Sequence, residues 1–266
     1  MMVLLAGIAT AIVAGFWLFD PSDDRPATPA PPTLTALWRG GFESGDFAQY
    51  ADAPWNFEGA GLPSIVDEPA KFGTYAARFA IPPGARRQEL VAMKPDGEPF
   101  KFQEGDELYF RFSTRFGNWP TVNTWQLIAQ WKADGAGSPP VAMLAGAWGR
   151  DRIQMAAAGW PGGGSREVHD LGPLVRDEWI DWVVRIDFSS DPGRSRVVVW
   201  RDGALVLDAP EWRPSFEGEE AGKAGGTLRR EAESYLKMGI YRNPEITQVG
   251  EYWADGWAIA REAGGR

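Results

Sequence analysis

The chain has 266 residues, of which 27 are basic and 36 acidic, giving a formal net charge of −9, and it contains no cysteine. Disulfide bonds and thiolate metal centres are therefore excluded, and the acidic balance argues against a nucleic-acid partner, which would need a basic surface. A polyanionic substrate would require that the basic side chains gather on one face.

The first segment, Met1–Phe19, is apolar and has no charged side chain. Its length suits a signal peptide or a membrane anchor, and the bulky residues of Phe16–Phe19 stand where a signal peptide would have small ones, which favours the anchor. Residues 20–36 are rich in Pro and Ala and predict a disordered spacer, followed by a domain over residues 37–266. We expect this domain to be extracellular, either secreted or anchored to the membrane by the N-terminal segment alone.

Alternation of apolar and polar residues predicts strands along the rest of the chain. In Glu107–Phe116 the even-numbered positions are mostly apolar and the odd-numbered ones mostly polar, and Ile180–Phe188 alternates similarly. Other such runs are Tyr75–Ile81, Glu89–Met93, Trp125–Ala133, Val141–Ala147, Arg196–Arg201, Ser234–Tyr241 and Tyr252–Ala260. Strands with one apolar face, in a chain with 14 Trp and 32 Gly and no long amphipathic helix, predict an all-β fold of two antiparallel sheets in a sandwich.

Several short motifs follow one another in a fixed order along this region. They are FESGDF at 42–47, GTYAARF at 73–79, RRQEL at 86–90, EGDELYF at 104–110, IAQWK at 128–132, WIDWVV at 179–184, VWRDG at 199–203, YLKMGIYR at 235–242 and YWADG at 252–256. Together they resemble the jelly-roll polysaccharide lyases of the heparin-lyase-I type, which are related to alginate and glucuronan lyases. The resemblance implies a concanavalin-like jelly-roll sandwich that acts on an acidic polysaccharide.

Lyases of this kind cleave by β-elimination at a uronic acid. The uronate carboxylate must be neutralised, a base must remove the neighbouring proton, and an acid must protonate the leaving oxygen. The resemblance implies that Tyr241 transfers the proton. It also implies that Lys237 either holds an acidic group of the substrate or stabilises the ionised Tyr241 through its charge. Gln130 and Arg87 are expected to neutralise the substrate carboxylate.

Strand alternation places the polar residues of three strands on one face of each strand. If these faces line one concave sheet, five side chains converge: Arg87, Gln130, Lys132, Lys237 and Tyr241. Further substrate-binding candidates are Glu89, Tyr235 and Arg111. Arg87 and Glu89 would equally well pair with each other across the sheet.

Lys132 departs from the family pattern, because the motif that begins at Gln130 usually ends in histidine. A lysine accepts a proton at neutral pH only when it is desolvated or crowded by other cations. Three outcomes stay open. Lys132 serves as an electrostatic clamp while Tyr241 is both base and acid, Lys132 is itself the base, or the site binds sugar without cutting it.

Two other classes of function remain as alternatives. One is a catalytically inactive glycan-binding module on the cell envelope, and the other is a glycoside hydrolase that pairs carboxylates from Glu43, Glu89 and Asp255. The only histidine, His169, lies in a loop after a glycine run and is a further candidate base. We expect a monomer without a cofactor. A structural calcium ion at Asp191 or Asp202 is an option, but turn chemistry also explains both residues.

Overall fold

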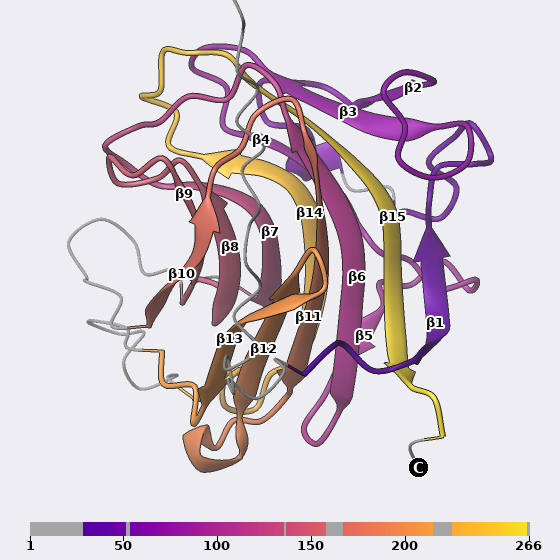
Figure 1. The fold of residues 1–266 in the computed structure, drawn as a ribbon, viewed down its shortest axis with the longest axis vertical. Helices are drawn as coiled ribbons and strands as arrows, with labels where there is room; N and C mark the ends of the chain where they lie inside the picture. The colour runs from indigo at the N-terminus through magenta and orange to yellow at the C-terminus, as the bar shows by residue number, and fades with distance from the viewer. Residues whose placement is uncertain (1–28, 52–53, 136, 158–166, 215–224, 265–266) are drawn as a thin grey trace, which may run out of the picture.

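The computed structural model describes residues 29–51, 54–135, 137–157, 167–214 and 225–264. They form two antiparallel β-sheets of eight and seven strands, joined by loops and two short 3-10 helices, η1 (Pro54–Phe57) and η2 (Pro192–Arg194). Figure 1 shows strands β7 to β10 on the left and β6, β15 and β1 on the right. The fold is the all-β two-sheet sandwich that the alternating sequence pattern predicts, and it is consistent with the jelly roll that the motif resemblance implies.

The eight-stranded sheet has the order β13-β12-β11-β6-β15-β3-β2, and β1 pairs with a further part of β15. Its strands are β1 (Leu34–Gly40), β2 (Ser64–Val66), β3 (Ala76–Ile81), β6 (Glu107–Phe116), β11 (Trp179–Asp187), β12 (Arg196–Arg201), β13 (Ala204–Pro210) and β15 (Gly250–Glu262). β15 is the longest, and it joins β6 to both β1 and β3.

The seven-stranded sheet has the order β10-β9-β8-β7-β14-β4, with β5 beside one end of β14. Its strands are β4 (Arg87–Val91), β5 (Lys101–Phe102), β7 (Gln126–Ala133), β8 (Val141–Ala145), β9 (Arg152–Ala156), β10 (Val168–Pro173) and β14 (Ser234–Arg242). The central position of β14, between β7 and β4, brings the residues of three sequence motifs together on neighbouring strands.

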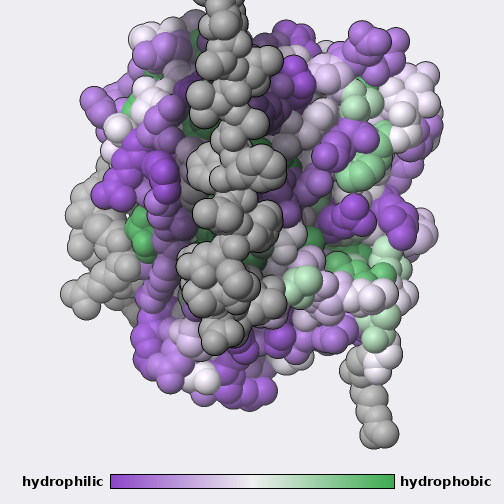
Figure 2. All heavy atoms as spheres, viewed as in Figure 1, coloured by the Kyte–Doolittle hydropathy of each residue, from purple (hydrophilic) through white to green (hydrophobic). Residues whose placement is uncertain are grey.

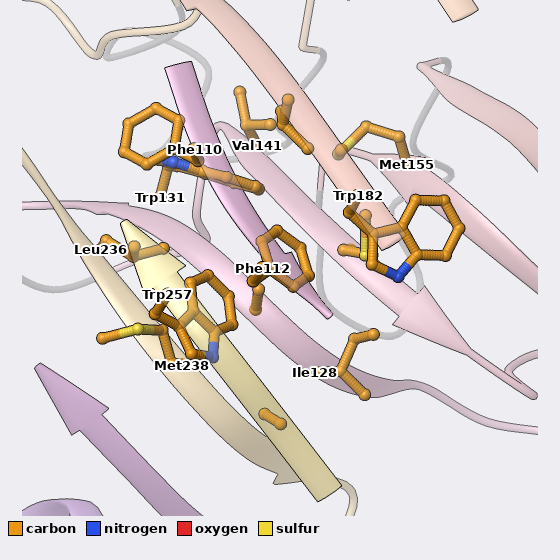
Figure 3. Packing of buried hydrophobic residues seen from close by; sticks show 14 of the residues in the cluster. Phe110, Phe112, Ile128, Trp131, Val141, Met155, Trp182, Leu236, Met238 and Trp257 are labelled. Carbon is orange, nitrogen blue, oxygen red and sulfur yellow. The ribbon is translucent and has the colours of Figure 1, made fainter. Parts of the chain in front are cut away.

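The core lies between the two sheets, where each strand turns its apolar side chains inward. Figure 3 shows Phe112 and Trp257 of one sheet beside Leu236 and Met238 of the other. The rings of Phe112 and Trp257 stack with centroids 3.9 Å apart. Burial of such a side chain contributes about 1.5–3 kcal/mol to stability, so aromatic packing replaces the disulfides that the chain does not have.

Hydrophilic side chains cover most of the described surface on the face seen in Figure 2, and hydrophobic ones show there in small patches. Nearly every predicted run is a strand within one or two residues of the expected bounds; Glu89–Met93, for example, corresponds to β4 at Arg87–Val91. His169, expected in a loop, lies in β10 instead.

The start of the domain differs from the prediction. Residues 34–36 were expected to belong to the disordered spacer, but they begin strand β1, because Leu34, Thr35 and Ala36 pair in register with the end of β15. The predicted signal peptide or anchor at Met1–Phe19 and most of the spacer lie outside the described residues. Within the described part of the chain, no helix is long and apolar enough to cross a membrane.

Candidate active site

The predicted site residues lie on the outer face of the seven-stranded sheet. Along β14, Leu236, Met238 and Ile240 are buried in the core between the sheets, so Tyr235, Lys237 and Tyr241 point to the opposite side. The register places the predicted site residues directly across from one another in three pairs: Lys237 with Gln130, Tyr241 with Arg87, and Tyr235 with Lys132. The convergence of the five side chains on one face is therefore confirmed.

Gly239 makes the local path of β14 possible. It has a φ of +130°, a conformation that L side chains rarely adopt, and the pairing of β14 with β7 shifts register between Met238 and Tyr241. A Cβ atom at Gly239 would lie 2.2 Å from the carbonyl oxygen of Gln88. Only glycine fits here, and the resulting irregularity sets the direction of Tyr241 relative to Lys237.

A buried carboxylate stands at the centre of the site. Glu89 has 1% of its side chain exposed, and its Oε2 lies 3.4 Å from Nε of Arg87 and 3.6 Å from Nζ of Lys237. Its Oε1 accepts a hydrogen bond from Nε2 of Gln130 at 2.5 Å. Two cations and an amide therefore compensate the charge, and Glu89 supports the site instead of contacting a substrate.

Lys237 is held inside this network. Its Nζ donates a hydrogen bond to Oδ1 of Asn56 at 2.8 Å, and Asn56 is fully buried in η1. Burial lowers the pKa of Lys237; the charge of Arg87 lowers it further, and the charge of Glu89 opposes both effects. Since 6% of the Lys237 side chain is exposed, its role here is to fix Glu89 and η1, rather than to hold an acidic group of a bound chain.

Tyr241 lies between two arginines and a tryptophan. Nη2 of Arg86 donates a hydrogen bond to the Tyr241 hydroxyl at 3.1 Å, and Cζ of Arg87 lies 4.3 Å from the centre of the ring. Trp125 meets the ring edge-on with centroids 4.9 Å apart. The sequence interpretation assigned the cation beside Tyr241 to Lys132 or Lys237, whereas the structure places a guanidinium on the hydroxyl.

Lys132 and Tyr235 occupy the β5 end of the site. Nζ of Lys132 donates hydrogen bonds to the carbonyl oxygens of Ala133 and Gly135 at 2.9 and 2.8 Å, which stabilises the charged ammonium. Burial, with the charges of Glu89 and Asp134 adding to it, raises the pKa of Tyr235 to about 12. Tyr235 is therefore a protonated hydrogen-bond donor near neutral pH and unsuited to act as a base.

Arg111 does not belong to this group, although the sequence analysis included it. It lies in β6 of the other sheet, on that sheet's outer face, where its guanidinium is 5.4 Å from the centre of the Phe72 ring. Alternation correctly predicted that Arg111 faces outward from its strand. The alternating pattern carries no information on which of the two sheets the strand joins.

The alternative carboxylates are also placed away from the site. Glu43 accepts hydrogen bonds from the backbone amides of Thr74 and Tyr75, and Asp255 accepts them from Lys71 and Phe72. Asp255 lies in β15 of the eight-stranded sheet and Glu89 in the other sheet. The carboxylate pair of a glycoside hydrolase that would include Glu89 is therefore not formed.

His169 and the turn aspartates have local roles. His169 lies across from Met155, a core residue, and its Nε2 is 2.9 Å from Oε2 of Glu167, so it does not face the site. Asp191 accepts a hydrogen bond from the amide of Gly193, and Asp202 accepts one from the amide of Asp181. The described residues contain no group of three or more His, Cys, Asp or Glu side chains that would hold a metal ion.

Two residues of the site were missed by the sequence interpretation. Arg86 directly precedes Arg87, and the adjacent basic pair was the only signal for it. Asn56 comes from a 3-10 helix far away in the sequence, and no motif marks it. The sheet face thus combines an arginine-bound phenol, a compensated buried carboxylate and several cations, which is an arrangement able to bind an anion and transfer a proton beside it.

A protein-family model described as polysaccharide lyase matches residues 42–258 of the chain. No curated protein sequence matches this chain. Among solved structures, the endo-β-1,4-glucuronan lyase from the fungus Trichoderma reesei has a similar fold, with a TM-score of 0.61 and 17% identity over 85% of this chain and 95% of that one. A cellulose-induced protein, Cip1, has a TM-score of 0.55 and 12% identity over 84% and 96% of the two chains.

Proposed function

Because the chain belongs to the polysaccharide lyase family, we propose that it cleaves a uronic-acid-containing polysaccharide by β-elimination, outside the cell and without a cofactor. The observation that carries the proposal is the position of the Tyr241 hydroxyl, on the outer face of β14 and hydrogen-bonded to Arg86 at 3.1 Å. An ionised phenol at this point is stabilised by the adjacent guanidinium, so Tyr241 is equipped to remove a proton.

The reaction proceeds in two stages. The Tyr241 phenolate takes the proton from C5 of the uronate, and the electron pair of that C–H bond moves onto the neighbouring carboxylate. The pair then returns to form the C4–C5 double bond as the bond from C4 to the glycosidic oxygen breaks, and this oxygen takes the proton back from Tyr241. One tyrosine thus serves as base and acid, and no net proton is gained or lost by the enzyme.

The substrate carboxylate needs a positive partner while the C5 proton leaves. Arg87 is the candidate, because its guanidinium lies over the Tyr241 ring and 18% of its side chain is exposed. The Gln130 amide already donates to Glu89, and its second N–H is the one that remains for a substrate. Lys132 fits the role of a clamp, since its ammonium is fixed by two carbonyl oxygens.

The polymer class follows from this chemistry and from the motif resemblance. A chain of uronic acids presents the carboxylate and the acidic C5 proton that the site requires. One protein of similar fold is a glucuronan lyase, which makes glucuronan the first polymer to test, followed by alginate and by heparin-type chains that match the heparin-lyase-I resemblance. We infer a monomer that is secreted or held at the membrane by residues 1–19.

The deciding experiment is incubation of the purified domain with each polymer over a range of pH. The expected result is a rise in ultraviolet absorbance from the unsaturated sugar, with the new double bond confirmed by mass measurement of the product. If none of the polymers yields an unsaturated product at any pH, the lyase proposal is wrong.

A second candidate is a glycan-binding module without catalysis. Its support is the substitution of Lys132 for the usual histidine and the engagement of the Gln130 amide by Glu89. It predicts retention of the chain on an immobilised polyuronate without cleavage. The lyase and the binding module are therefore distinguished by the same incubation.

A further inference from the structure

A second hollow region lies on the outer face of the eight-stranded sheet, away from Tyr241. Two adjoining cavities of about 370 and 460 Å³ share three lining residues, Arg39, Arg111 and Ala258. Pro31–Leu34 border the first cavity, and Phe72 and Gln49 line the second. Because the two cavities share these residues, we describe them as one groove, with Arg39 and Arg111 at its centre.

The strand register explains why these arginines stand together. Ala258 of β15 is the direct partner of Arg39 in β1 and also of Arg111 in β6. The three residues form one row across three strands, so the two arginine Cα atoms lie roughly 10 Å apart, twice the usual strand spacing. The small side chain of Ala258 leaves the space between the two exposed guanidinium groups open.

Neither arginine has an acidic partner among the described residues, which is unusual in a chain with a net charge of −9. The guanidinium carbon of Arg111 lies over the face of the Phe72 ring, 5.4 Å from its centre. Three carboxylates line the two cavities, and each has other partners. Glu43 accepts from the amides of Thr74 and Tyr75, Asp255 accepts from those of Lys71 and Phe72, and Asp181 pairs with Lys71 and accepts from the hydroxyl of Ser113. The positive charge of the row is therefore available to a ligand.

We propose that the Arg39–Ala258–Arg111 row binds a carboxylate of an anionic polysaccharide, as a second binding site on the face opposite the catalytic one. Two like charges in one row repel each other. An anion that bridges them relieves the repulsion and accepts hydrogen bonds from both guanidinium groups. Pro31–Leu34 on one side of the row and Phe72 on the other would border the neighbouring sugars. That the ligand is a polyuronate rests on the proposed function; that it is anionic rests on the row itself.

The test compares the retention of variants in native gels that contain glucuronan, alginate or a neutral glucan. All variants carry Tyr241→Phe, so that the polymer stays intact. We expect Arg39→Gln/Arg111→Gln to bind the anionic polymers at least about tenfold more weakly, as loss of charged hydrogen bonds implies. Arg194→Gln/Arg213→Gln removes the same charge from exposed residues outside the groove, and should bind as the parent does.

Two results would overturn the proposal. One is equal retention of the parent and the Arg39/Arg111 variant, and the other is equal weakening by the Arg194/Arg213 variant, which would reflect net charge alone. Failure of the lyase proposal is seen separately, as the absence of unsaturated product from the chain with Tyr241 intact. The chain with Tyr241 intact could lack lyase activity while retention still depends on Arg39 and Arg111. That result would support the second binding site and reject only the proposed lyase activity.

Discussion

The hydroxyl of Tyr241 accepts its hydrogen bond from Arg86, on the loop that leads into β4, at a distance of 3.1 Å. A phenol in this position has a charged donor directed at its oxygen. The contact joins a motif of β14 to a residue for which the sequence indicated no role.

Replacement of Tyr241 by Phe removes this oxygen and keeps the ring between Arg87 and Trp125. We expect turnover to fall by about 10²–10⁴-fold, the usual share of a general acid–base step. Retention on immobilised polyuronate should stay nearly unchanged, because the guanidinium groups remain. Product formation by the variant at the rate of the parent would exclude Tyr241 as the proton-transfer group.

Arg86→Gln removes the charge beside the phenol and leaves a neutral donor. Turnover should drop about 10-fold to 100-fold, in line with the value of a hydrogen bond from a charged donor. Arg86→Lys is the matched control, and should restore part of the lost activity. Turnover of Arg86→Gln equal to that of the parent would contradict the assignment.

Lys237→Met tests the buried ion network. The change leaves Glu89 with Arg87 as its remaining cation and breaks the hydrogen bond to Asn56, so we expect a loss of about 3–5 kcal/mol in the free energy of unfolding. Chemical denaturation of both proteins measures the difference. The combined variant Glu89→Gln/Lys237→Met should recover part of the loss, since it removes the uncompensated carboxylate.

The same pair of proteins gives a pH test. Burial lowers the pKa of Lys237 in the folded chain below its usual 10.5. The unfolded chain therefore binds this proton more tightly, and folding carries a cost that is present in full below the lowered pKa. The cost disappears as the pH rises from that value toward 10.5, so the stability of the parent relative to Lys237→Met should increase over this alkaline range. A constant difference there would show that the pKa of Lys237 is not lowered.

Lys132→His restores the side chain that the family motif usually carries. We expect activity at neutral pH to be preserved or increased, because an imidazole accepts a proton where an ammonium does not. The carbonyl oxygens of Ala133 and Gly135 lose their charged donor, which should cost little at this partly exposed position. Loss of activity in this variant, with folding intact, would make the positive charge of Lys132 essential and support its role as a clamp.

Much of this site could be predicted from strand alternation and motif order. The period of two puts Lys237 and Tyr241 on one face of β14, and Gln130 and Arg87 lie on the strands to either side of it, as the convergence on one sheet requires. Alternation could not tell which sheet the strand of Arg111 joins, because the outer faces of both sheets have the same pattern.

The contacts that define the chemistry of the site could not be predicted from the sequence. Arg86 and Asn56 belong to connecting segments whose positions depend on how the sheets and loops pack, and neither segment has a periodic pattern. The commitment of Gln130 to Glu89 is also a matter of side-chain geometry. A sequence motif can indicate that the residues of the site lie close together. It does not indicate which of them bind each other and which are left to bind a substrate.

The gathering of Arg86, Arg87, Lys132 and Lys237 on one sheet face has a consequence for how fast a polyanion reaches this enzyme. The chain as a whole carries −9 and repels a polyanion at long range, whereas the sheet face attracts it on contact. At about 0.1 M salt the Debye length is about 10 Å, which screens the distant repulsion more than the contact attraction. The association rate should therefore pass through a maximum as ionic strength increases, instead of falling steadily as it does for a uniformly basic protein.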